Sequence, residues 1–157
     1  MVRLMDIKKV GLASDHAGYP LKKFVEQYLE EKGWPVQDYG CWSDTSVDYP
    51  DYAHALAEGI EDGICNVGIG ICGSGEGMAI TLNKHQAVRA GLVWCSEVAE
   101  LIRQHNDANV IVLPGRFINN NEARKILDVF FKTNFEGGRH ARRVEKISGK
   151  FKLVFEK

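Results

Sequence analysis

Residues 66–77, NVGIGICGSGEG, join an apolar run to a glycine-rich turn. The run 66–71 shows no alternation of apolar and polar side chains, which is typical of a strand buried on both faces of a parallel sheet. It ends at Cys72, and the glycines of 73–77 let the backbone turn tightly and approach a ligand closely. The stretch therefore predicts a central parallel strand that leads directly into a candidate site.

Strand-like and helix-like patterns alternate along the rest of the chain. Short apolar runs predict further strands, at 10–13, 35–39, 88–94 and 110–113. Apolar residues at helical spacing predict helices that begin near Pro20, Pro50, Ser96 and Asn120 or Asn121, with Ser96 as an N-cap. The alternation predicts a single-domain, Rossmann-like, doubly wound parallel sheet of about five strands with helices on both faces.

The length and composition fit one globular domain of 157 residues with a net charge of −1. That charge predicts no nucleic-acid or anionic-membrane partner. No apolar run approaches the roughly 20 residues of a membrane span, and we expect no signal peptide. The cysteines lack metal-site or disulfide spacing, which favours reduced thiols in the cytoplasm. A C-terminal tail, 138–157, starts with a short helix, and we expect the tail to pack on a partner subunit.

Polar residues gather where the predicted strands end, which is where doubly wound sheets bind ligands. These residues are Asp15-His16, the turn 72–77, Cys95-Ser96 and Gly115-Arg116. Backbone N–H groups of the turn can hold an anion. A plain tight turn is the alternative, but it leaves the reactive side chains there unexplained. The glycine spacing supports neither a P-loop nor an NAD site, because Gly68 and Gly70 fall inside the strand.

Two side chains in the turn could act as a base. Cys72 ends the strand near a helix start, which favours a thiolate, although free cysteine is often just a small buried residue. Glu76 is either a helix-start carboxylate or a base directed into the cleft. A thiolate and a carboxylate so close repel each other, so we do not expect both to be ionised and directed inward. We favour Cys72, which needs no loop rearrangement, and keep Glu76 as the alternative.

Other polar residues have both a functional and a structural interpretation. His105 could act as an acid or base, or simply cap a helix. Arg139 and Arg143 are four residues apart and could face one phosphate, or form a solvated basic surface. His54 and His85 are expected to be structural or surface residues.

Collinear segments within residues 9–148 resemble the B-type ribose-5-phosphate isomerase family, which includes the galactose-6-phosphate isomerase subunits. The segments are SDHAG (14–18), DYPDYA (48–53), ICGSG (71–75), NK (83–84), RA (89–90), RQHND (103–107), NV (109–110) and EGGRH (136–140). The resemblance implies an aldose–ketose isomerase of ribose 5-phosphate that uses no metal or cofactor. It also implies a homodimer, or a dimer of dimers, with active sites shared between subunits.

Two alternative functions stay open under this resemblance. One is isomerisation of another sugar phosphate, such as galactose or allose 6-phosphate or a tetrose phosphate. The other is a non-catalytic partner subunit of such an isomerase.

The resemblance also implies catalytic roles by position. His105 matches the acid that opens the furanose ring, and Cys72 matches the proton-abstracting base of many members. Glu76 departs from the commonest pattern, in which an apolar residue stands there. A second group of members has a glutamate there as the base and lacks the cysteine, whereas this chain has both.

The same resemblance implies a substrate-binding set. Its enediolate loop comprises Gly73, Ser74, Gly75 and Gly77. Its sugar-hydroxyl positions are Asp15 and Asn106, and its phosphate positions are His16, Arg139 and Arg143. Arg116 matches another binding position and is a candidate for the neighbouring subunit's site.

Overall fold

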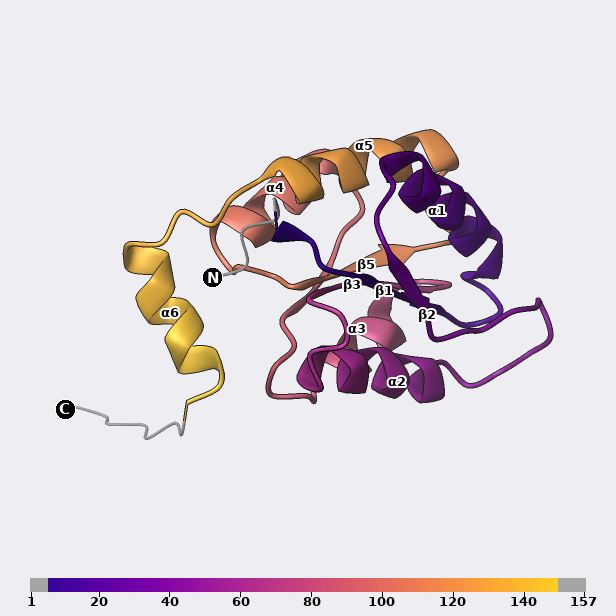
Figure 1. Cartoon of the computed structure of the whole chain (residues 1–157), viewed down its shortest axis with the longest axis horizontal. Coiled ribbons are helices and arrows are strands. Elements are labelled where there is room, and N and C mark those ends of the chain that lie inside the picture. The colour runs from indigo at the N-terminus through magenta and orange to yellow at the C-terminus, as the bar shows by residue number, and fades with distance from the viewer. Residues whose placement is uncertain (1–5, 150–157) are drawn as a thin grey trace.

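The computed structural model describes residues 6–149, which form one sheet with helices on both faces (Figure 1). The strands are β1 (Val10–Ser14), β2 (Val36–Asp38), β3 (Val67–Cys72), β4 (Ala90–Leu92) and β5 (Val110–Pro114). The helices are α1 (Tyr19–Lys32), α2 (Tyr49–Glu61), α3 (Glu76–Leu82), α4 (Ser96–Gln104), α5 (Asn120–Lys132) and α6 (Arg139–Ile147).

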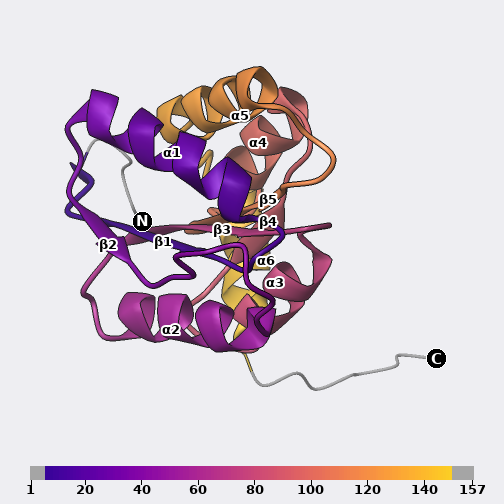
Figure 2. The ribbon, with the colours of Figure 1, turned by 90° about the vertical axis from the view of Figure 1, so that its right-hand side faces the viewer.

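The five strands lie in the order β2-β1-β3-β5-β4, and every neighbouring pair is parallel. Figure 2 shows α1, α4 and α5 above the sheet and α2 and α3 below it. β3 is central, and all of its residues are buried. The predicted doubly wound parallel sheet is confirmed.

The two faces of β3 carry different side chains. Val67, Ile69 and Ile71 point to the face covered by α1, α4 and α5 and join its apolar core. The alternate residues, Gly68, Gly70 and Cys72, face α2 and α3. A side chain at Gly70 would come within 2.8 Å of Met78 Cγ on α3. Gly70 therefore lets α3 lie close to the strand, whereas a side chain at Gly68 would meet Leu56 of α2 at 3.1 Å. Both glycines have a packing role and not a nucleotide-binding one.

The helix that follows β3 lies on the opposite face of the sheet from the helices that follow the two neighbouring strands. The strands β1 and β5 flank β3 and are followed by α1 and α5 on one face, whereas β3 is followed by α3 on the other. Loops that diverge in this way leave a crevice at the carboxyl end of the sheet, where ligands bind in open α/β folds. The turn after Cys72 lies at this point.

Most predicted elements are present, and the differences have local causes. Gly33 ends α1 in the left-handed conformation (φ 68°), and α5 begins at Asn120 after a capping box of Asn119 and Glu122. The prediction that Ser96 caps its helix is wrong, because Cys95 holds the N-cap position and no side chain caps α4. The fourth strand is shorter than 88–94, because β4 lies at the sheet edge and pairs only with β5.

The helix α6 lies beyond the amino-terminal edge of the sheet, at the left of Figure 1. Of its residues, only His140 is buried. The last part of the predicted tail, 150–157, lies outside the described residues. Within residues 6–149, no helix has both the length and the apolar character needed to cross a bilayer.

Shortening a side chain in the core between the sheet and α5 should lower the stability of the folded protein by a large amount. Phe130 is fully buried, so Phe130→Ala should lower the free energy of unfolding by about 3–5 kcal/mol in urea titrations. Ile64→Ala, at a half-exposed turn position, is the control and should change it by less than about 0.5 kcal/mol. Equal losses for the two variants would contradict this packing.

Candidate active site

The carboxyl edge of the sheet brings together residues that are far apart in the sequence. Asp15 and His16 follow β1, Cys72 ends β3 and the turn 73–77 follows it, and Arg116 follows β5. The turn is fixed to its neighbours by backbone hydrogen bonds. Gly115 N donates to Cys72 O at 2.9 Å, and Arg116 N donates to Gly73 O at 3.0 Å. The three strand ends therefore form one polar surface.

The glycine turn has a conformation that few other residues could adopt. Gly75 is the N-cap of α3 in the left-handed region (φ 80°), and a side chain there would collide with Leu92. Gly73 lies against the Arg116 side chain, whose Nη1 is 3.4 Å from the position of a Cβ at Gly73. Arg116 thus lies against its own chain's turn, and its role in the neighbouring subunit's site stays a prediction.

The Cys72 thiol lies beneath the first turn of α3. Only 4% of Cys72 is exposed, and this burial raises the pKa of its thiol above the ordinary value. The backbone N–H groups of Met78, Gly75 and Ser74 act in the opposite direction and favour the thiolate. Burial outweighs them, so the thiol is protonated at neutral pH and is not the thiolate that the nearby helix start predicts.

Glu76 occupies the outer side of the same turn. It is the first residue of α3, its side chain is exposed, and its N–H donates to Ser74 Oγ at 3.3 Å. The expectation that Cys72 and Glu76 do not both face inward agrees with this arrangement.

His16 is held in a defined orientation by the loop before α2. The backbone N–H of Val47 donates to His16 Nδ1 at 3.2 Å. In the neutral imidazole the hydrogen must then lie on Nε2, which is free to donate to an anion. Asp15 is buried, and its Oδ1 accepts the N–H of Gly18 at 2.9 Å.

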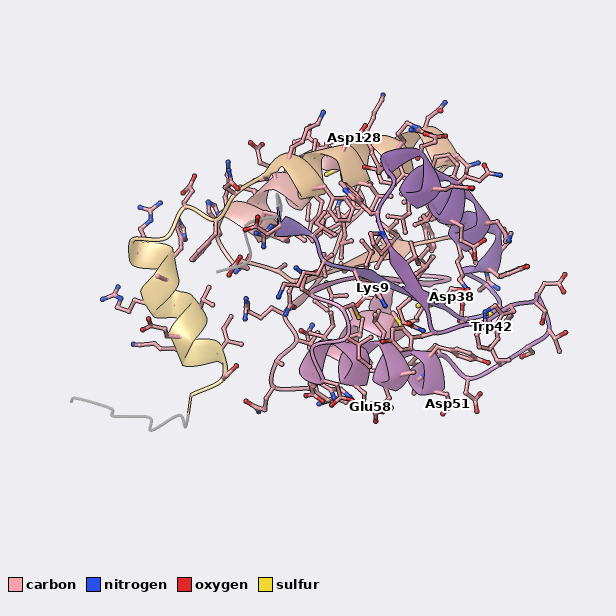
Figure 3. All side chains as sticks on the ribbon, in the orientation of Figure 1. Lys9, Asp38, Trp42, Asp51, Glu58 and Asp128 are labelled. Carbon is pink, nitrogen blue, oxygen red and sulfur yellow. The ribbon has the colours of Figure 1, made fainter. Side chains whose placement is uncertain are left out.

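A buried ion pair anchors the start of the loop that holds His16. Lys22 Nζ donates to Asp38 Oδ1 at 2.6 Å and to Cys41 O at 2.7 Å. Asp38 also accepts the indole N–H of Trp42 at 3.0 Å; both residues are labelled in Figure 3. This anchoring had no signal in the sequence. The same is true of Tyr49, whose ring covers Gly77.

The other predicted site residues lie at the opposite edge of the sheet. His105 is the C-cap of α4, and its ring stacks on that of His140 with centroids 4.3 Å apart and planes at 9°. Arg139 and Arg143 follow on α6, one turn apart. Burial, together with the neighbouring His105 and Arg139, lowers the pKa of His140, so this ring is neutral at neutral pH.

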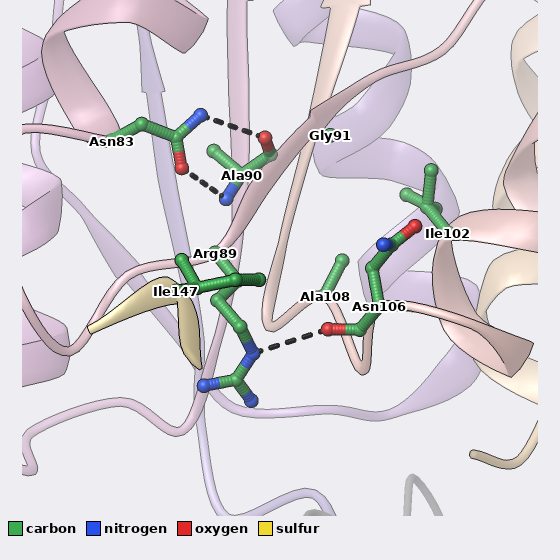
Figure 4. A pocket seen from close by; sticks show the side chains of 8 residues that line it. All are labelled: Asn83, Arg89, Ala90, Gly91, Ile102, Asn106, Ala108 and Ile147. Carbon is green, nitrogen blue, oxygen red and sulfur yellow. Dashed lines mark hydrogen bonds between the residues drawn. The ribbon is translucent and has the colours of Figure 1, made fainter. Parts of the chain in front are cut away.

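Two guanidinium groups hold the turn that carries Asn106. Arg103 is buried, and its Nη1 donates to Asp107 Oδ1 at 2.9 Å and to Ala108 O at 2.7 Å. Arg89 Nε donates to Asn106 O at 3.2 Å, beside a cavity of about 190 Å³ (Figure 4). These contacts hold Asp107 at φ 46°, where a residue other than glycine is uncommon.

One chain cannot bring Cys72 and His105 to the same small ligand. His105 and Asn106 precede β5, whereas Cys72 ends β3, so the two groups lie at opposite ends of parallel strands. A strand of this length spans roughly 15–20 Å. Within a single chain, therefore, Cys72 does not lie together with His105 and the arginines of α6.

The cluster of His105 and His140 with the arginines of α6, at the amino-terminal edge of the sheet, suits an anion better than a cation. Ligand atoms of His105, Glu136 and His140 lie within 4.8 Å of one another, as in many metal sites. However, Arg139 Nε points at His140 Nε2 from 3.5 Å, and Arg143 lies one turn further along α6. Cationic neighbours disfavour a metal ion there, so we assign it no metal.

Comparisons with known proteins agree with this geometry. A family model described as Ribose/Galactose Isomerase matches residues 10–147. Ribose-5-phosphate isomerase B of Escherichia coli is 42% identical over 144 residues, which cover 90% of this chain and 95% of the relative. A crystal structure of ribose 5-phosphate isomerase from Thermotoga maritima is similar with a TM-score of 0.87 at 46% identity, covering 89% of this chain and 97% of that one. Ribose-5-phosphate isomerase B from Mycoplasma genitalium, crystallised with bound ribulose-5-phosphate, gives a TM-score of 0.84 at 43% identity, with coverages of 89% and 93%.

The shape of the turn predicts a difference between two glycine substitutions. Gly63 and Gly75 have similar positive φ values, 69° and 80°, but only Gly75 has a side chain, that of Leu92, in the way. Gly63→Ala should lower the free energy of unfolding by about 1–2 kcal/mol through φ alone. Gly75→Ala should lower it further, and Leu92→Ala should recover part of the extra loss. Equal losses for the two glycine variants in urea titrations would contradict this geometry.

Proposed function

Because the chain belongs to the ribose/galactose isomerase family, we propose that it is an aldose–ketose isomerase that interconverts ribose 5-phosphate and ribulose 5-phosphate. The observation that carries the proposal is the Cys72 thiol beneath the backbone N–H groups that begin α3. That arrangement suits removal of a proton from carbon followed by stabilisation of the resulting oxyanion.

Cys72 is the base in the proposed reaction. As a thiolate it removes the C2 proton of the open-chain aldose, and the electron pair of that C–H bond forms the C1–C2 double bond of an enediolate. The same thiol returns the proton to C1, while the hydroxyl proton passes from O2 to O1, which leaves a hydroxyl on C1 and the carbonyl at C2. Backbone N–H groups of the 73–77 turn stabilise the enediolate, by about 3 kcal/mol per donor. A base with a raised pKa suits this step, because a carbon-bound proton is weakly acidic.

The remaining residues bind the sugar and open its ring. His105 acts as the ring-opening acid, and Asp15 and Asn106 bind sugar hydroxyls. The phosphate binds to His16, Arg139 and Arg143, and Arg116 lies beside the turn. Phosphate binding far from C1 and C2 supplies energy that positions the reacting carbons.

We propose that each active site is shared between two copies of the chain. The carboxyl edge of one copy supplies Cys72, and the amino edge of the other supplies His105 with the α6 arginines. Support comes from the span of roughly 15–20 Å between these groups within one chain.

A homodimer also accounts for exposed apolar surface beside the turn. A hollow of about 370 Å³ next to Ser74 is lined by Leu92, Trp94, Pro114 and Phe117. Trp94 is 58% exposed and Phe117 is 74% exposed. Exposed aromatic side chains around a hollow are typical of protein interfaces. We propose that the second copy covers this hollow.

We further propose that the enzyme acts in the cytoplasm, in the pentose phosphate pathway. All four cysteines are free thiols, and free thiols are usual in a reducing compartment.

The choice of base predicts opposite outcomes for two variants. Cys72→Ala should lower turnover of ribose 5-phosphate by about 10²–10⁴-fold, whereas Glu76→Gln should change it by less than about tenfold. Cys95→Ala is the control for loss of a thiol outside the turn. Near-normal turnover of Cys72→Ala together with loss in Glu76→Gln would assign the base to Glu76.

The pH dependence gives an independent test of the same choice. Burial raises the pKa of the Cys72 thiol, so the thiolate fraction grows as the pH rises through neutrality into the alkaline range. Turnover of the wild type should rise over that range. A flat profile would contradict a thiolate base.

The shared site predicts complementation between two inactive variants. In a mixed dimer of Cys72→Ala and His105→Gln chains, one of the two sites has both Cys72 and His105. Random mixing should therefore restore about a quarter of wild-type turnover. Each variant alone should remain inactive, and failure of mixed, folded dimers to regain activity would contradict a shared site.

A further inference from the structure

Three side chains outside the active site form a hydrogen-bonded chain between α2 and the segment that follows α3. His54 Nδ1 lies 2.7 Å from His85 Nε2, and His85 Nδ1 lies 3.0 Å from Glu61 Oε2. His54 and Glu61 are seven residues apart on α2, so they lie on the same side of the helix, two turns apart. His85 bridges them with both ring nitrogens. The proposed function uses none of the three.

The carboxylate of Glu61 fixes the tautomer of His85. A carboxylate can only accept, so His85 Nδ1 carries a hydrogen and Nε2 of the neutral ring has a lone pair. His54 then donates through Nδ1. An imidazole held by a carboxylate on one nitrogen, with the other nitrogen free to donate electrons, is the usual arrangement of a metal-ligating histidine.

We propose that His54 Nδ1 and His85 Nε2 bind a divalent cation of the Zn²⁺ class, with Glu61 orienting His85 from behind. The two nitrogens are 2.7 Å apart, and tetrahedral Zn–N bonds of about 2.0–2.1 Å require them to be about 3.3 Å apart. The rings must therefore separate by less than about 1 Å. The His54 hydrogen moves from Nδ1 to Nε2, so binding requires no net loss of a proton from two neutral rings.

We assign the third ligand to Glu58, whose carboxylate must rotate to reach the two rings, because Glu58, His54 and His85 do not form a close ligand cluster in this structure. It follows His54 by one turn of α2 and precedes Glu61 by three residues, so it projects from the same side of the helix that His85 contacts (Figure 3 labels Glu58). Its side chain is exposed and can rotate towards the two rings. Water would complete a tetrahedral set.

Acidic side chains favour a cation at His54 and His85, whereas arginines disfavour one at His105 and His140. Glu58, Glu61 and Asp62 are exposed acids at the end of α2. Lys84 precedes His85, but its side chain is exposed and can remain in solvent. At His140, by contrast, an arginine nitrogen points at the ring nitrogen that a metal would need.

Metal binding at this position would link α2 to the end of α3, the helix that begins at the catalytic turn. His85 is only 16% exposed, so bound metal would join two packed segments and not two mobile side chains. A ligand that binds only the folded state raises the unfolding temperature.

Calorimetric titration of the tag-free, full-length wild type with Zn²⁺ tests the site without reference to isomerase activity. We expect one equivalent to bind and to raise the unfolding temperature. His54→Gln and His85→Gln should abolish both effects. Glu61→Gln should weaken binding by about 10–100-fold, as expected for loss of the carboxylate behind a metal ligand. Circular dichroism and turnover of ribose 5-phosphate should be unchanged in all three variants.

Glu136→Gln is the matched control, because it removes the carboxylate of the other histidine cluster. It should bind Zn²⁺ as the wild type does. The proposal is overturned if folded His85→Gln still binds one equivalent, if Glu136→Gln abolishes binding, or if the wild type binds none.

Discussion

The chain leaves β3 towards one face of the sheet and leaves both neighbouring strands towards the other, and the active site depends on this divergence. Gly70 allows α3 to pack closely against the strand that precedes it, and Gly68 does the same for α2. Cys72 follows them in the same two-residue phase, so its side chain faces α3. Backbone N–H groups of the turn and of the first turn of α3 favour its thiolate. The close packing of α3 at Gly70 thus contributes to both the burial of the thiol and the electrostatic field around it.

Each strand of a parallel sheet starts at one edge of the sheet and ends at the opposite edge. The turn after β3 and the turn before β5 therefore diverge, although β3 and β5 are hydrogen-bonded neighbours. Hydrogen bonds from Arg89 and Arg103 hold the Asn106 turn at its own edge, away from Cys72. A second copy related by a two-fold axis solves this geometric problem, since each copy then offers one edge to the other.

The sequence predicted those features that depend on local pattern. The unbroken apolar run 66–71 predicted a central parallel strand, and Gly33 predicted a helix end that requires positive φ. The residues that follow the strands, such as Asp15 and Arg116, could be placed at the carboxyl edge of the sheet, because all parallel strands end at the same edge. The edge strand β4 was predicted too long, since its pattern does not reveal that it has a single partner.

Long-range side-chain contacts could not be predicted from the sequence. Tyr49 over Gly77 and the Lys22–Asp38 pair each join different elements, and neither residue pair has a recognisable spacing. The same holds for His54 and His85, which were expected to be unremarkable structural or surface residues, yet lie in contact because α2 packs against α3. Such contacts depend on helix rotation and crossing, which a hydrophobic pattern constrains only loosely.

The proposed isomerisation moves a proton from C2 to C1 of ribose 5-phosphate through the Cys72 thiol. The direct measurement is NMR of the reaction in D₂O. Proton transfer through the Cys72 thiol predicts ribulose 5-phosphate with deuterium at C1, because the thiol exchanges with solvent before it returns the proton. Formation of ribulose 5-phosphate without any deuterium, or no conversion of ribose 5-phosphate at all, would contradict the claim.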